Sequence, residues 1–131
     1  MALFDRKRLE VATEGAWVTG KEVEAFGDGA ILVRGLASDP VRDAFASKAR
    51  SAKKAERAPD GSLLPSCLTR HTREVLSEHC VLDAKDLPFT ADEIRKMLQD
   101  PAYEALITAV ITACQHVDAL SQEIEEQTSK N

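Results

Sequence analysis

Residues 101–127 read PAYEALITAVITACQHVDALSQEIEEQ, and this stretch carries the most regular apolar pattern in the chain. Asp100 and Pro101 supply the cap-plus-proline signal that opens many helices. Apolar side chains then recur at alternating spacings of three and four residues, which places them along one helical face. They are Tyr103, Leu106, Val110, Ala113, Val117, Leu120 and Ile124. The pattern predicts a long C-terminal helix.

The two halves of this helix differ in the width of their apolar face. Three further apolar residues widen the first half into a core-like face: Ile107, Ile111 and Cys114. The second half narrows to three residues, here called the C-terminal seam: Val117, Leu120 and Ile124. Burying such side chains is worth roughly 1.5–3 kcal/mol each. We therefore expect a second copy of the chain or another protein to cover the seam, with Glu123 beside it. The alternative is that this end folds back on the β region.

Upstream of this helix, Thr90 and Glu93 have the spacing of a capping box, in which each side chain bonds the other residue's amide. Phe89 and Ile94 occupy the flanking hydrophobic staple positions. These signals predict a helix over residues 91–99.

The N-terminal part of the chain has strand-like runs at residues 16–18, 23–26 and 30–34. A Gly-Asp-Gly turn at residues 27–29 separates the last two runs. The pattern predicts two or three short antiparallel strands within residues 15–36. The expected fold class is therefore α+β, with a small N-terminal antiparallel hairpin or sheet, a mainly helical body and a long C-terminal helix.

A length of 131 residues fits one domain. Its expected parts are a loose lead-in at residues 1–14, the β region at 15–36, a basic helix at 39–58, a loop at 59–65 and a helical region at 66–127. Within the last region, residues 66–79 have helical spacing and residues 80–88 read as a connector.

The basic helix carries Arg50, Lys53 and Lys54 among its outward cations. No aromatic residue is interleaved with these cations for base stacking, and acidic residues dilute them. We interpret the basic face as a solvated surface, with an acidic protein surface as a further option, and expect no nucleic acid partner.

Charge is unevenly distributed along the chain. Residues 1–73 hold 13 Lys+Arg against 10 Asp+Glu, and residues 74–131 hold 4 against 12, for a net charge of -5. The acidic half argues against a nucleic acid partner and is compatible with a basic protein partner.

No segment has the roughly 18 apolar residues of a membrane span. The first eight residues, MALFDRKR, lack the order of a secretory signal, so we expect a cytoplasmic protein.

The three cysteines, Cys67, Cys80 and Cys114, are widely spaced, which favours free thiols. Cys67 and His71 lie four residues apart and invite a metal or nucleophile hypothesis. Neither the close-spaced knuckles of a zinc ribbon nor an oxyanion-hole element accompanies them. We therefore expect no metal, no cofactor and no enzymatic activity.

Four stretches together carry a family resemblance: residues 15–18 (GAWV), 31–36 (ILVRGL), 87–98 (LPFTADEIRKML) and 100–106 (DPAYEAL). In this order, the chain resembles the tail assembly chaperones of siphophages and related prophages over residues 15–131. It lacks the tryptophan that the family has in the connector before residue 87.

The resemblance implies a protein that binds the tape-measure protein, keeps its hydrophobic helices soluble and helps to recruit tail-tube subunits in the host cytoplasm. Family members leave before the virion matures. The alternative is a structural head–tail or tail-completion protein that stays in the particle.

Overall fold

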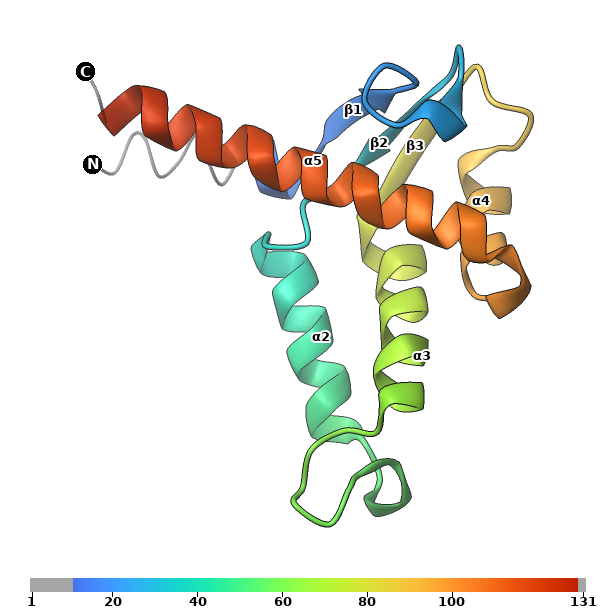
Figure 1. Cartoon of the computed structure of the whole chain (residues 1–131), viewed down its shortest axis with the longest axis vertical. Helices are drawn as coiled ribbons and strands as arrows, with labels where there is room; N and C mark the ends of the chain where they lie inside the picture. Colours follow the sequence, from blue (N-terminus) through green and yellow to red (C-terminus); the bar gives the residue numbers. More distant parts are fainter. Residues whose placement is uncertain (1–10, 130–131) are drawn as a thin grey trace.

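The computed structural model describes the backbone of residues 11–129 and the side chains of residues 11–123. A three-stranded antiparallel sheet, whose first two strands lie near the N-terminus, is combined with a mostly helical body, and a long helix, α5 (Glu104–Ser129), ends the described chain. Figure 1 shows α5 crossing the sheet and the upper ends of two helices that extend away from it. The α+β class expected from the sequence is confirmed.

The sheet has the order β1-β2-β3, formed by β1 (Ala16–Thr19), β2 (Ala30–Val33) and β3 (Val81–Lys85). The third strand therefore comes from the segment that we expected to be a connector. The expected strand at residues 23–26 is wrong, because η1 (Glu24–Phe26) is a 3₁₀ turn. Val23 and Phe26 lie three residues apart, so this turn directs both side chains into the core.

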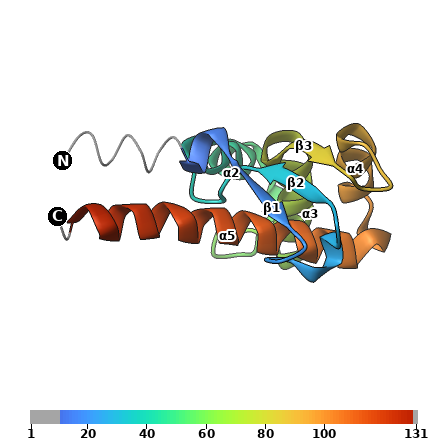
Figure 2. The same ribbon diagram turned by 90° about the horizontal axis from the view of Figure 1, so that it is seen from above.

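Helix α5 covers one face of the sheet, as Figure 2 shows from above. The inward residues of the sheet and of α5 are fully or almost fully buried in one core: Val18, Ile31, Val33, Val81, Val110, Ala113, Cys114 and Val117. The opposite face of the sheet carries more polar and exposed residues. There the Lys85 ammonium lies 4.3 Å from the centre of the Trp17 ring, a cation–π contact. The alternation of strand side chains thus produces one buried and one solvated face.

Two helices form an arm that extends away from α5 (Figure 1). They are α2 (Asp39–Ser51) and α3 (Pro65–Val75), and η3 (Leu76–Cys80) continues α3 as a wider π-helical turn. The expected basic helix over residues 39–58 is too long, because Ala52 is already extended. The Arg57 guanidinium donates to the Ala49 carbonyl, so the chain folds back at the end of α2.

Helix α4 (Ala91–Leu98) begins at the predicted capping box. Thr90 Oγ1 accepts from the Glu93 amide at 3.2 Å, and the Thr90 amide donates to Glu93 Oε1 at 3.1 Å. Two side chains of α4, Ile94 and Leu98, are buried. A short turn, η4 (Pro101–Tyr103), then leads into α5, and the Asp100 carboxylate caps that turn through the Ala102 amide.

The corner between β2 and α2 is tied to α5 by one carboxylate. Asp118 Oδ2 accepts from the Leu36 amide at 3.0 Å, and Oδ1 accepts from the Ala37 amide at 3.1 Å. Gly35 allows this approach, because an added Cβ would lie 2.1 Å from Asp118 Oδ1. Burial raises the pKa of the Asp118 carboxyl, while the two amide bonds act in the opposite direction.

The same corner also holds the N-terminal part of the described chain. The Arg34 side chain donates to the carbonyls of Thr13 at 2.7 Å and His79 at 3.0 Å. Residues 11–14 are helical and Ala12 is buried, so this end of the expected loose lead-in is packed. Residues 1–10 lie outside the described part of the chain.

Thr90→Ala should lower the free energy of unfolding by about 0.5–2 kcal/mol, because it removes the side-chain oxygen that caps α4. Urea denaturation measures this loss. Thr108→Ala is the matched control, since Thr108 is exposed within α5 and alanine suits a helix interior. Equal midpoints for wild type and Thr90→Ala would contradict a stabilising cap.

Gly35→Ala and Asp118→Ala should each cost roughly 1–3 kcal/mol, through crowding in the first case and unpaired amides in the second. Their effects should not add, because the new methyl group at residue 35 meets a carboxylate that the double variant lacks. A double-mutant cycle by denaturation should therefore give a coupling of at least about 0.5 kcal/mol. Additive losses would show that Gly35 is needed for another reason.

Candidate functional site

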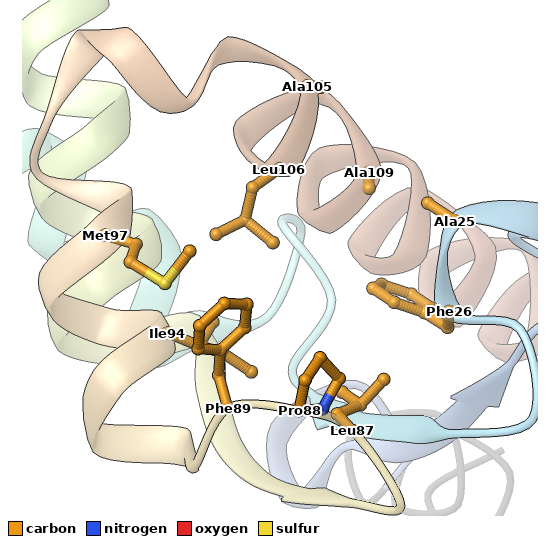
Figure 3. Close-up of a pocket in the computed structure, with 10 residues that line it drawn as sticks. All are labelled: Ala25, Phe26, Leu87, Pro88, Phe89, Ile94, Met97, Ala105, Leu106 and Ala109. Carbon is orange, nitrogen blue, oxygen red and sulfur yellow. The ribbon is translucent and has the colours of Figure 1, made fainter.

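A pocket of about 260 Å³ opens between η1, the loop before α4, α4 itself and the start of α5. Figure 3 shows its side chains converging from these four segments. All of its lining residues are apolar, and the larger ones are Phe26, Leu87, Phe89, Ile94, Met97 and Leu106. This apolar pocket is the best candidate for a functional site in the described part of the chain.

Local structure explains why these side chains meet. Ile94 and Met97 are three residues apart on α4 and therefore share one helical face. Leu106 faces them from the first turn of α5, and Phe26 closes the opposite side (Figure 3). Phe89, in the loop that enters α4, remains 43% exposed at the rim although it also lines the pocket.

Charged residues that adjoin the lining residues in the chain are more often acidic than basic. Four exposed acidic residues are direct chain neighbours of lining residues: Glu24, Asp86, Glu93 and Glu104. Two basic residues, Arg95 and Lys96, are also direct chain neighbours of lining residues. The Arg95 side chain donates to the carbonyls of Val81 and Leu82, each at 3.0 Å, and the Glu93 carboxylate accepts from the Thr90 amide, so both side chains are committed to the fold. The apolar lining suits an apolar side chain of a partner.

The C-terminal seam is only partly available in the structure. Val117 is fully buried in the core, so the expectation that this residue awaits another chain is wrong. Its neighbour Asp118 fixes α5 against the β2–α2 corner, which turns Val117 inward. Leu120 is half-buried and Glu123 is exposed. The side chain of Ile124 lies outside the described residues.

The basic residues that we singled out lie far along the arm. Arg50 is near the end of α2, and Lys53 and Lys54 follow that helix, at the end that points away from α5 (Figure 1). All three are exposed. Lys48, by contrast, lies 3.6 Å from carboxylate oxygens of both Glu74 and Glu78, which joins α2 to α3 and its continuation. The structure therefore does not bring the basic residues and the C-terminal seam together.

A second cluster consists of Glu56, Cys67 and His71, here called the Glu56 cluster. Cys67 Sγ lies 3.3 Å from Glu56 Oε2 and 3.4 Å from His71 Nε2. The Arg70 guanidinium bonds the same carboxylate and, with the Lys53 amide and the Cys67 thiol, lowers the pKa of Glu56 to about 2. Burial and the nearby Glu56 raise the pKa of the Cys67 thiol. A protonated thiol is a poor nucleophile, so the arrangement does not favour cysteine catalysis.

The other two cysteines belong to the core. Cys80 and Cys114 are fully buried, and a hydrogen bond between them, together with burial, raises the pKa of the Cys114 thiol. Buried thiols of this kind behave as small apolar side chains. They are therefore not positioned to act on a substrate.

The apolar pocket is not predicted by any sequence pattern, because its walls come from segments far apart in the chain. One local signal did point to it, since Phe89 and Ile94 of the predicted staple both line the pocket. Phe26 and Leu106 are far apart in the sequence, so no local pattern relates either residue to the pocket.

Searches for similar proteins return no family model, no curated protein and no solved structure that matches the chain. No helix in the described part of the chain is long and apolar enough to cross a bilayer. The resemblance to tail assembly chaperones therefore stays an expectation from the sequence.

Proposed function

We propose that the chain is a phage tail assembly chaperone that binds a helical segment of the tape-measure protein in the apolar pocket. The observation that carries this proposal is an open, wholly apolar pocket with an aromatic side chain exposed at its rim. Exposed apolar surface with a polar surround is typical of protein interaction sites. The bound segment would insert apolar side chains spaced three or four residues apart.

The position of the pocket in the sequence supports the same role. Seven of its ten lining residues fall in two of the four stretches that carry the family resemblance, residues 87–98 and 100–106. These stretches also contain the caps that start α4 and η4. The resemblance and the candidate site thus concern the same part of the molecule.

Charge gives the proposed interaction its selectivity. Glu24, Asp86 and Glu104, which are exposed and adjoin lining residues in the chain, would favour an apolar helix with lysine or arginine near its anchors. The exposed Arg50, Lys53 and Lys54 lie on another part of the molecule and offer a second surface, suited to an acidic partner. A chaperone that also recruits tail-tube subunits needs two separate surfaces of this kind.

Phe89→Ala should weaken binding of the tape-measure protein by at least about tenfold, because aromatic residues that a partner buries often carry much of the binding energy. The measurement is the affinity of each variant for the tape-measure protein of the same phage, obtained by titration. The tape-measure protein is produced by co-expression with the chain. Leu68→Ala is the matched control, since Leu68 is 49% exposed on the arm and does not line the pocket. Denaturation curves for both variants would show that the fold is kept.

Three outcomes would contradict the proposal. Unchanged binding by Phe89→Ala would exclude the pocket as the interface. Loss of binding by Leu120→Asp alone would move the interface to the C-terminal seam. Stoichiometric amounts of the chain in purified virions would favour the head–tail or tail-completion alternative, because an assembly chaperone leaves the particle.

A further inference from the structure

The Glu56 cluster brings together three side chains that ligate metals. Cys67 and His71 are four residues apart on α3, so both face the same side, where they are only 3% and 5% exposed. Glu56 reaches them from η2 (Lys54–Glu56), the short turn at the end of the arm. One ligand atom from each residue lies within 4.8 Å of the other two.

The two separations from Cys67 Sγ fit the edges of a tetrahedral metal site, and the separation between Glu56 and His71 is within 4.8 Å. Zinc forms bonds of about 2.3 Å to sulfur and about 2.0–2.2 Å to nitrogen or oxygen, so neighbouring ligand atoms lie roughly 3.5 Å apart. The separations from Cys67 Sγ are 3.3 Å to Glu56 Oε2 and 3.4 Å to His71 Nε2. The hydrogen bonds of the Cys67 thiol can therefore be replaced by bonds to an ion with little movement of the side chains.

Charge balance also suits a divalent ion. A Cys67 thiolate and the Glu56 carboxylate would neutralise the two charges of the ion, and His71 would bind as a neutral imidazole. The nearby Arg70 cation has a second partner, because its Nε lies 3.4 Å from Glu74 Oε1. Arg70 also donates to Glu56 Oε2, the oxygen that would bind the ion, and lies 3.9 Å from Cys67 Sγ, so the ion would share this carboxylate with Arg70 or turn the guanidinium toward Glu74.

We propose that Glu56, Cys67 and His71 form a zinc-binding site, with a solvent oxygen as the fourth ligand. Mixed sulfur, nitrogen and oxygen ligands in tetrahedral positions are typical of zinc. The ion would join η2 to α3 and fix the returning segment at the end of the arm. This proposal reverses the expectation of no metal, which considered spacing among cysteines and histidines and could not include Glu56. It is independent of the proposed chaperone role.

The test uses the full chain freed of metal by chelation, then titrated with Zn²⁺ and with Co²⁺ as a spectroscopic substitute. We expect one ion per chain, a thiolate-to-cobalt charge-transfer absorption and release of the Cys67 proton on binding. Zn²⁺ should also raise the midpoint of thermal unfolding, because it binds the folded state. The unmodified protein gives each of these results, so the test does not depend on how any variant folds.

Variants then locate the ion. Cys67→Ser should abolish the charge-transfer absorption, and Glu56→Gln should weaken Co²⁺ binding by at least about tenfold. Cys114→Ala and His116→Gln are matched controls outside the cluster and should bind as the unmodified chain does. The proposal is overturned if the unmodified chain shows no charge-transfer absorption, or if the absorption persists in Cys67→Ser.

Discussion

The fold depends on how the Asp118 carboxylate joins the last helix to the corner where the sheet passes into the arm. Its two oxygens accept from the amides of Leu36 and Ala37, and Gly35 provides the space for this approach. This contact fixes the rotation of α5 about its axis, so that Val110 and Val117 face the sheet. The same rotation and position bring Leu106, one turn before Val110, to the apolar pocket. A carboxylate on one side of α5 therefore determines what the other sides can contact.

Sequence signals that depend on near neighbours predicted their elements well. The Thr90 cap, the strand at Ala30–Val33 and the long final helix all depend on residues a few positions apart. The failures concern contacts made across long stretches of chain. Val81–Lys85 becomes a strand because β2 is available to pair with it, and α2 ends early because Arg57 returns to the Ala49 carbonyl. Neither partner is visible from local propensity.

Prediction of the candidate sites is limited in the same way, because they also depend on contacts between distant segments. Helical periodicity placed Val117 and Leu120 on one face, but periodicity does not say what covers a face. The structure covers Val117 with the domain's own core and leaves Phe89, which the staple pattern had assigned to local packing, exposed at a pocket rim. The spacing of Cys67 and His71 indicates part of the Glu56 cluster, but Glu56 reaches it from η2 only through the tertiary fold. The chemistry of a site that is assembled from several segments can be inferred only once the tertiary contacts are known.

Phe89 differs from the buried residues Ile94 and Leu98 because much of its side chain is exposed and is not required for folding. The caps and buried residues of the loop and α4 have clear structural roles: Thr90 starts the helix, and Ile94 and Leu98 fill the core. A phenylalanine that leaves 43% of its surface in water contributes only part of its burial energy to folding. Its exposed part gains that energy only when another surface covers it. An apolar pocket with an aromatic side chain exposed at its rim therefore favours a partner that presents an apolar surface.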